Sequence, residues 1–318
     1  MKKKIVAILL AACCAAALVA MTACSNNSSE DLQPSANDKA DENATEFSNS
    51  PFYALIVGND TRNGTKDEGK GTHGADGQQR SDTMMLMRVD PSNYQITIVS
   101  IPRDTQTTID GETCKINEAY NRGGIEGSVA KVEEYTGVNI KYYFDVSFVE
   151  FENLVDAMGG VDVNVPVTMT FKDVVKGGTI TLQPGDQHLD GREALVFARV
   201  RKVYQEMDSS RQYDDRQIVQ SLMQKVINDP ASVAGYADDF MNIVHTNMSA
   251  NELLYYATKF AENSSSVNFL SGSFPADGDI DAATGLWLAW YNPDTWNAIV
   301  DVVDAGGDPN SVYTPPFG

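Results

Sequence analysis

FYALIVG, residues 52–58, is a short apolar run that ends in glycine, and it predicts a strand buried within a sheet. Two more strands are predicted over residues 83–89 and 94–101, and the turn DPSN at residues 90–93 joins them into a hairpin. Further strand and helix patterns are interleaved along the chain, and the helices gather late, one of them predicted over residues 215–228. This order predicts an α/β fold, a layered α-β-α domain around a mixed, largely central β-sheet.

The first residues have the composition of an export signal. Three lysines at positions 2–4 precede the apolar run of residues 5–20, and the small residue Ala23 stands directly before Cys24, as in the lipobox of bacterial lipoproteins. We interpret residues 1–23 as a signal peptide of the lipoprotein type and predict lipidation at Cys24. The alternative is an uncleaved transmembrane helix over residues 5–23, which can just span a hydrocarbon core of about 30 Å. Both interpretations place the folded body at the extracytoplasmic face of the cell membrane, because the lysines stay in the cytoplasm.

The rest of the chain divides by composition. Residues 24–50 are polar, acidic and nearly free of large apolar side chains, so we expect a disordered acidic tether. Residues 51–275 hold the periodic segments and are expected to form the catalytic domain. Residues 276–318 form a C-terminal extension whose role the sequence leaves open, although its three tryptophans are expected to attach it to the body or to line a surface.

The charge of the chain excludes one class of partner and indicates another. The formal net charge is −20, which disfavours binding to nucleic acid. All ten arginines nevertheless lie between Arg62 and Arg216, and residues 217–318 contain none. The guanidinium group is suited to bidentate recognition of phosphate. Ordinary surface ion pairing is the alternative explanation, so the local context of each arginine must distinguish the two.

Four polar clusters stand at the ends of predicted strands or on late helices. They are Gly58-Asn-Asp60-Thr-Arg62, Arg80-Ser-Asp82-Thr83, Ser100-Ile-Pro-Arg103-Asp104, and a set formed by Arg199, Arg201, Asp208, Arg211, Arg216 and Gln217. Ligands bind at strand ends in open α/β sheets, and we expect Asp60 and Asp82 to share one Mg²⁺ there. Each Asp–Arg pair taken singly is explained as well by a loop salt bridge. Taken together, the clusters favour a multiply charged anion such as pyrophosphate.

Seven motifs in order resemble the LytR-CpsA-Psr family. They are GNDTR, RSDTMML, SIPRD, KINEAY, LVDAMGGVDV, LDGREALVFARVR and DDRQ, and the similarity runs from Phe52 to Ile227. The resemblance implies a Mg²⁺-dependent phosphotransferase that attaches glycopolymers to the bacterial cell wall. Members of the family transfer a polymer, with its proximal phosphate, from a polyprenyl pyrophosphate carrier to a sugar hydroxyl of peptidoglycan.

The resemblance also implies roles for individual residues. Asp60 and Asp82 correspond to carboxylates that hold the metal, and with Arg80 and Arg103 they form the expected catalytic set. The family spaces its late arginines as D-x-x-R-x-x-R-Q, whereas here four residues separate Arg211 from Arg216. The sequence therefore leaves open which of these two arginines reaches the phosphate. The full set expected to bind pyrophosphate is Arg62, Arg80, Arg103, Arg199, Arg201, Arg211, Arg216 and Gln217.

A polyprenyl tail requires an apolar slot beside the charged site. The candidate slot residues, which must also serve as ordinary core, are Phe144, Phe148, Phe151, Leu154, Leu195, Val196 and Phe197. Two other functions stay open at this point. One is a pyrophosphatase that hydrolyses the lipid carrier without an acceptor, and the other is a non-catalytic, lipid-anchored binding protein for extracellular sugars or phosphate.

Overall fold

The structure is a computed structural model that describes residues 47–61, 79–201, 203–204 and 207–315. The predicted signal peptide, Cys24 and Arg62 lie outside these residues. In the part that the structure describes, no helix is both long enough and apolar enough to cross a membrane.

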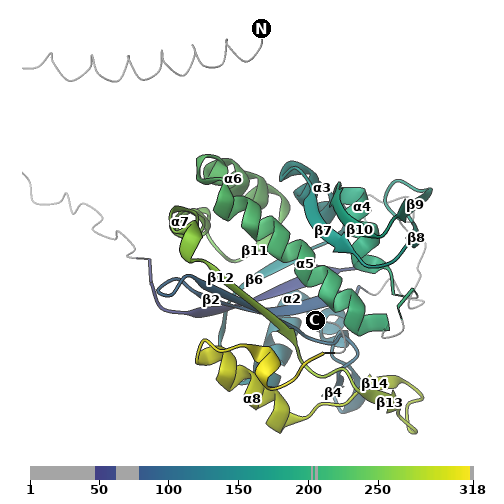
Figure 1. The fold of residues 1–318 in the computed structure, drawn as a ribbon. Helices are drawn as coiled ribbons and strands as arrows, with labels where there is room; N and C mark the ends of the chain where they lie inside the picture. Colours follow the sequence, from purple (N-terminus) through teal and green to yellow (C-terminus); the bar gives the residue numbers. More distant parts are fainter. Residues whose placement is uncertain (1–46, 62–78, 202, 205–206, 316–318) are drawn as a thin grey trace, which may run out of the picture. The chain divides into compact units, whose positions relative to one another are not determined.

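A mixed sheet forms the centre of the described chain (Figure 1). Its six strands follow the order β11-β6-β1-β2-β3-β12. Strands β1 and β6 are parallel, as are β3 and β12, and the other neighbours are antiparallel. The strands are β1 (Phe52–Asn59), β2 (Ser81–Asp90), β3 (Gln95–Ser100), β6 (Ile140–Val146), β11 (His245–Thr246) and β12 (Asn268–Ser273).

Helices cover both faces of this sheet (Figure 1). One face packs against α2 (Glu118–Thr136) and α8 (Pro293–Asp304). The other face packs against α3 (Phe148–Ala157), α5 (Met207–Asn228), α6 (Val233–Ile243) and α7 (Ala250–Glu262), and α4 (Gly191–Arg199) packs on α3 and α5. Short 3₁₀ turns span Pro230–Ser232, Ser264–Ser266 and Pro309–Ser311. The predicted α-β-α layering is confirmed.

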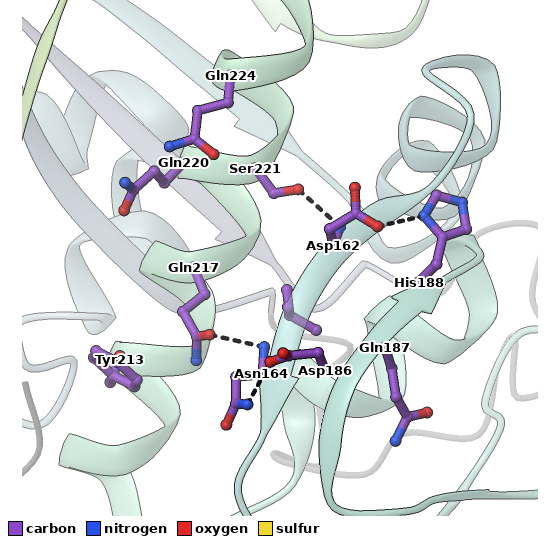
Figure 2. Close-up of a pocket in the computed structure, with 11 residues that line it drawn as sticks. Asp162, Asn164, Asp186, Gln187, His188, Tyr213, Gln217, Gln220, Ser221 and Gln224 are labelled. Carbon is purple, nitrogen blue, oxygen red and sulfur yellow. Dashed lines mark hydrogen bonds and ion pairs between the residues drawn. The ribbon is translucent and has the colours of Figure 1, made fainter.

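Four two-stranded pairs surround the central sheet in the described residues. They are β4 (Gln106–Ile109) with β5 (Glu112–Lys115), β7 (Val161–Val165) with β10 (Gly185–Leu189), β8 (Met169–Lys172) with β9 (Thr179–Leu182), and β13 (Gly278–Ile280) with β14 (Trp287–Ala289). The outer edge of β7 faces α5, where Ser221 Oγ accepts from the backbone N–H of Asp162 at 2.8 Å and Gln217 Oε1 accepts from that of Asn164 at 3.1 Å (Figure 2). Side chains of α5 thus satisfy strand donors that would otherwise lack partners.

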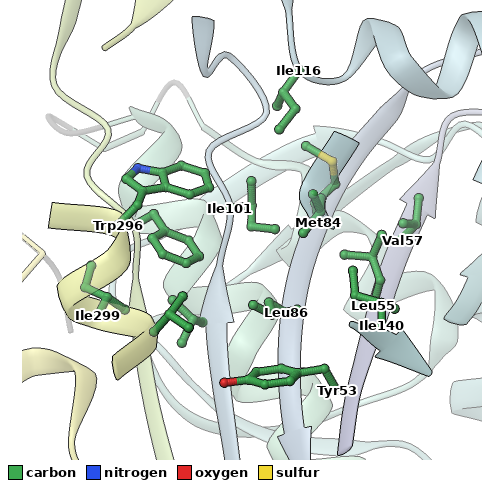
Figure 3. Close-up of a cluster of buried hydrophobic side chains, with 14 of the residues drawn as sticks. Tyr53, Leu55, Val57, Met84, Leu86, Ile101, Ile116, Ile140, Trp296 and Ile299 are labelled. Atoms are coloured by element: carbon green, nitrogen blue, oxygen red, sulfur yellow. The ribbon is translucent and has the colours of Figure 1, made fainter. Parts of the chain in front are cut away.

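Strand β1 supplies both faces of the core because side chains alternate along a strand. Tyr53, Leu55 and Val57 pack toward α2 and α8, where Trp296 and Ile299 complete the cluster (Figure 3). Phe52 and Ala54 point to the opposite face. The FYALIVG run is therefore apolar throughout because both faces of its strand are covered.

Helix α5 begins at Met207, not near residue 215 as predicted. Its first turns carry polar residues that hide any apolar periodicity, and several of these are buried. Arg211 pairs with Asp208 three residues before it at 3.0 Å and with Asp215 four residues after it at 2.9 Å. These intrahelical pairs allow a polar segment to continue the helix into the protein interior.

The C-terminal residues contribute to the same core as β1. Trp296 is fully buried and stacks on Phe274, with ring centroids 3.9 Å apart and an interplanar angle of 15°. Its indole Nε1 has no hydrogen-bond partner among the described residues. The indole therefore stabilises the fold through packing, and its N–H adds a small cost.

Replacement of Trp296 by Ala should lower the free energy of unfolding by about 3–5 kcal/mol, because it leaves a large cavity beneath β3 and β12. Trp296→Phe should cost clearly less, since it keeps a ring against Phe274 and removes the unpaired N–H. Urea unfolding followed by circular dichroism measures both. Equal losses for the two variants would contradict this account of the packing.

Candidate functional site

A cavity of about 640 Å³ lies between the sheet and the helices α3, α5, α6 and α7. Residues at both ends of β1, Phe52 and Gly58, line it, so it extends for roughly 20 Å along the strand. Close-packed cores rarely retain apolar space of this size, because lost packing destabilises the protein. The apolar part of the lining includes Ile56, Met85, Met87, Phe144, Phe148, Phe151, Leu154, Met158, Leu195, Leu222, Met223, Val226, Phe240 and Phe260.

One end of the cavity is strongly polar. Among the described residues, six cationic side chains and four carboxylates line it, an excess of positive charge in a chain whose net charge is −20. The cations are Arg80, Arg103, Lys115, Arg199, Arg201 and Arg211, and the carboxylates are Asp60, Asp82, Asp104 and Asp215. We call this end the mouth. Local charge of this sign favours an anionic ligand.

The ends of β1 and β2 present the first pair of mouth residues. Asp60 N–H donates to Arg80 O at 3.1 Å, and Asp60 Oδ1 accepts from Arg80 N–H at 2.8 Å. Behind them, Asn59 Nδ2 and Tyr120 Oη both donate to the carboxylate of Asp145, each at 2.9 Å. This buried network fixes the strand end from which Asp60 projects.

Arg103 follows β3 and links the mouth to the neighbouring loop. Its Nη1 donates to Asp82 Oδ1 at the start of β2. Its Nε lies 3.9 Å from Asp104, whose carboxylate also pairs with Lys115 Nζ at 2.9 Å. Carboxylates on both sides therefore fix the orientation of the Arg103 guanidinium.

Asp208, in the first turn of α5, joins three arginines. Its Oδ1 accepts from Arg211 Nη2 at 3.0 Å and lies 3.7 Å from Arg103 Nε and 3.8 Å from Arg201 Nη1. Burial alone would raise the pKa of Asp208, but the charges of Arg211 and Arg103 lower it. The sequence places Asp208 near the late arginines but does not indicate its role, because that role depends on Arg103, more than a hundred positions earlier.

A second buried carboxylate supports Arg211 from the other side. Asp215 Oδ2 accepts from Thr83 Oγ1 and from Arg211 Nη1, each at 2.9 Å. Burial raises the pKa of Asp215 to about 6, although Arg211 opposes the shift. Burial would lower the pKa of Arg211, but Asp208, Asp215 and Asp82 together raise it. Thr83 was expected only as a member of the cluster that begins at Arg80, and Asp215 was not among the expected site residues.

Arg199 lies where the mouth meets the apolar part of the cavity. Its guanidinium carbon is 4.7 Å from the ring centroid of Phe148 and 5.2 Å from that of Phe171. All three side chains line the cavity. Stacking on two rings holds the guanidinium plane at this boundary between the mouth and the apolar part of the cavity.

The structure does not bring every expected residue to the mouth. Arg216 is buried outside the cavity, where its Nη1 donates to Ser100 Oγ at 2.9 Å and burial lowers its pKa to about 10. Gln217 faces a separate crevice of about 510 Å³ along β7 (Figure 2). Arg62 lies outside the described residues. Of the two late arginines, it is Arg211 that lines the mouth.

A repeated dipeptide in the sequence could have indicated which face of α5 points to the mouth. Arg-Gln occurs at 211–212 and again at 216–217, and the sequence leaves both arginines as candidates but predicts only the glutamine of the second copy, Gln217, as a site residue. In the structure the first copy turns inward: Gln212 is buried, donates to Asp208 Oδ2 at 3.1 Å and accepts from Ser273 Oγ at 2.8 Å. The spacing from Asp208 to Arg211 supported this choice already in the sequence.

Five of the seven candidate slot residues line the cavity, namely Phe144, Phe148, Phe151, Leu154 and Leu195. Val196 and Phe197 instead belong to a separate buried cluster with β7 and α5. On α4, residues one position apart point in different directions, so only part of the helix can face the cavity.

The donor set at the mouth is compatible with a bound Mg²⁺. No group of three or more His, Cys, Asp or Glu side chains gathers as a metal site in the described ranges. Asp60 and Asp82 both line the mouth, however, and Mg²⁺ in phosphate-binding sites is held by one or two carboxylates together with phosphate oxygens. Two carboxylates among arginines therefore suit a metal that arrives with a phosphate ligand.

The cavity as a whole has the properties of a site for an amphiphile. Its mouth can hold a group with several negative charges, and its apolar part can hold a long hydrocarbon tail. The sequence profile of the LytR_cpsA_psr family matches residues 18–289. The chain belongs to the LytR-CpsA-Psr family. The resemblance seen in the seven motifs is thereby confirmed.

Known members of the LytR-CpsA-Psr family resemble the chain over most of its length. The polyisoprenyl-teichoic acid–peptidoglycan teichoic acid transferase TagU of Bacillus mycoides is 35% identical over 252 residues, covering 77% of this chain and 74% of the relative. TagU of Bacillus cereus is 34% identical over 272 residues, covering 82% and 81%. The crystal structure of TagV from B. subtilis has a TM-score of 0.68 at 25% identity and covers 81% of this chain and 97% of that one.

Asp214, next to Asp215 in α5, generates a pH-dependent prediction. Tyr204 Oη donates to its carboxylate, and burial raises its pKa to about 8. Because the pKa of Asp214 is higher in the folded protein than its unfolded value of about 3.9, the protonated side chain stabilises the fold. This stabilisation is complete below pH about 4 and is lost as the pH rises to about 8. The melting temperature of Asp214→Asn should therefore increasingly exceed that of the wild type between pH 4 and 8, then level off.

Thermal unfolding at several pH values tests this, with the exposed Asp238→Asn as a control for loss of one carboxylate. The free energy of unfolding of Asp214→Asn, relative to that of the wild type, can rise by up to about 1.4 kcal/mol per pH unit. A difference between Asp214→Asn and wild type that stays constant with pH would show that Asp214 is already ionised in the folded protein.

Proposed function

We propose that this protein is an extracytoplasmic phosphotransferase that attaches a glycopolymer, carried on polyprenyl pyrophosphate, to peptidoglycan through a phosphodiester bond. The observation that carries the proposal is one cavity in which an arginine-rich mouth opens into a long apolar chamber. The relatives named above are transferases that, as their names state, act on polyisoprenyl-teichoic acid and peptidoglycan. The chain and these relatives share family, fold and most of their length.

The two ends of the polyprenyl-pyrophosphate donor bind in different parts of the cavity, and this orients the donor. The polyprenyl tail occupies the apolar chamber between the sheet and α3, α5, α6 and α7, where burial of each CH₂ contributes about 0.8 kcal/mol. The pyrophosphate then lies at the mouth among Arg80, Arg103, Arg199, Arg201 and Arg211. Carboxylates already hold Arg103 and Arg211 in place, so these side chains lose little conformational freedom on binding.

Transfer is a single displacement at phosphorus. A sugar hydroxyl oxygen of peptidoglycan attacks the phosphorus that carries the polymer, the bond to the bridging oxygen breaks, and polyprenyl phosphate leaves. The hydroxyl proton passes to a carboxylate at the mouth. The arginines stabilise the charge that develops on the leaving phosphate. A Mg²⁺ held by Asp60 and Asp82 would supply further neutralisation of the pyrophosphate oxygens.

Location at the outer face of the membrane belongs to the same proposal. The basic and apolar start of the chain, with Cys24 after Ala23, supports a lipid anchor over a transmembrane helix. A lipidated N-terminus would keep the protein beside membrane-bound donors, and residues 24–50 would give the enzyme reach toward the wall.

Purified protein supplied with Mg²⁺, a polyprenyl-pyrophosphate-linked oligosaccharide and peptidoglycan should form a phosphodiester to glycan, detected by mass spectrometry of muramidase digests. Arg103→Ala should lower the rate about 100-fold or more, because one charge-stabilising group is lost. Arg122→Ala removes an arginine that pairs with Asp110 and Glu112 outside the cavity, and it should retain activity.

Chelation of the metal should abolish transfer, and added Mg²⁺ should restore it.

Release of the polymer without a phosphodiester, in the presence of peptidoglycan, would instead identify a pyrophosphatase. Tight retention of donor without turnover would identify a binding protein. Thermal unfolding of Arg103→Ala must accompany the assay, so that a loss of folding is not taken for a loss of chemistry.

Cys24→Ala should prevent lipid attachment and move the protein out of the detergent-extracted membrane fraction or leave its signal uncleaved. Mass spectrometry of the N-terminus and fractionation of expressing cells measure both. Unchanged membrane association of Cys24→Ala, with residues 1–23 retained in wild type as well, would indicate a transmembrane anchor instead.

A further inference from the structure

Large exposed apolar side chains gather on the hairpin formed by β13 and β14. Seven such side chains are exposed in the described ranges, and four of them lie here: Ile280 is 65% exposed, Trp290 56%, Trp287 40% and Leu286 39%. Ile280 and Trp287 are direct partners across the two strands. Leu288 and Ala289, by contrast, are buried, so the hairpin is packed against the body along one part and free along another. We call these four exposed residues the aromatic hairpin surface.

This hairpin is attached directly to the mouth of the cavity. Ala289 N–H donates to Asp104 O at 2.9 Å, and Ala289 forms an isolated bridge with Thr105. Asp104 lines the mouth and lies beside Arg103. Figure 1 shows the hairpin next to β4, the strand that follows this loop. Trp287 and Trp290 stand two residues before and one residue after Ala289, so the backbone of both lies close to the loop that carries Asp104.

The charges that the hairpin itself carries restrict what can bind to it. Residues 260–318 contain no lysine, arginine or histidine, and Asp277, Asp279 and Asp281 belong to the hairpin or its turn. An anionic lipid surface or a polymer rich in phosphate would be repelled. Indole rings and carboxylates together suit a neutral polyhydroxylated chain, because the rings can cover the C–H faces of sugars while carboxylates accept from hydroxyls.

We propose that the aromatic hairpin surface binds the glycan backbone of the acceptor, with Trp287 and Trp290 stacked on its sugar rings. This inference rests on the proposed transfer to peptidoglycan. At most about 10 Å of extended chain separates the Cα atoms of Trp287 and Trp290, a distance within the length of a short oligosaccharide. Binding there places a neighbouring sugar hydroxyl at the mouth, beside Arg103 and Asp104. The donor and the acceptor then approach the phosphorus from different parts of the molecule.

Binding can be measured without catalysis. Wild-type protein should cosediment with purified peptidoglycan stripped of attached polymers, and N-acetylglucosamine oligomers should change its tryptophan fluorescence. The double variant Trp287→Ala/Trp290→Ala should bind peptidoglycan about tenfold more weakly, and Trp287→Phe/Trp290→Phe should recover part of the affinity. Leu254→Ala, which removes a side chain 38% exposed on α7, is the matched control and should bind as wild type. Unchanged cosedimentation of the double alanine variant would overturn the proposal.

Kinetics separate this inference from the proposed function. In the transfer assay the double alanine variant should raise KM for the acceptor about tenfold and leave KM for the donor within twofold. Normal transfer with an unchanged acceptor KM would overturn the hairpin assignment and leave the transferase intact. Absence of transfer by wild type, with tryptophan-dependent binding to peptidoglycan, would overturn the transferase alone. Indole-dependent binding to phosphatidylglycerol vesicles, without binding to peptidoglycan, would assign the surface to the membrane and refute the proposal.

Discussion

The arrangement of the mouth depends on carboxylates that keep mutually repelling arginines together. Asp208 contacts Arg103, Arg201 and Arg211, while Asp82 and Asp215 hold Arg103 and Arg211 from other directions. A buried guanidinium without such partners would cost several kcal/mol. The carboxylates come from β2 and α5, so the strand ends and the helix N-terminus must meet for the site to exist. The fold is therefore required to bring together segments that are far apart in sequence.

The two faces of the central sheet have different tasks. Toward α2 and α8 the core is filled, with Trp296 stacked on Phe274 beneath the strands. Toward α3, α5, α6 and α7 the same strands line an open chamber. Strand β1 belongs to both faces, since alternate side chains point each way. The filled face therefore contributes close packing, whereas the other face leaves apolar surface available to a ligand.

Sequence patterns predicted the parts of the fold and site that depend on local order. The apolar run at residues 52–58 and the following hairpin predicted the central strands, and strand ends predicted that Asp60, Arg80, Asp82 and Arg103 would lie together. The sequence held a cue to the phase of α5 in the repeated Arg-Gln dipeptide, but it left both arginines as candidates. Five residues turn a helix by about 140° relative to its starting face, so Arg211 and Arg216 cannot share a side. Asp215 was missed because its role comes from a long-range contact with Thr83. The C-terminal tryptophans were expected to attach the extension or to line a surface, and only the structure shows that Trp296 does the first while Trp287 and Trp290 are exposed.

The cations at the mouth also bear on release of the product. A pyrophosphate esterified at both ends carries one negative charge on each phosphate, about −2 in total, and the monophosphate left on the lipid carries about −1.5 to −2 at neutral pH. The same guanidinium groups would therefore retain the spent carrier almost as firmly as the donor. Free polyprenyl phosphate would then compete with fresh donor for the site, so that removal of used lipid into the membrane becomes part of each cycle.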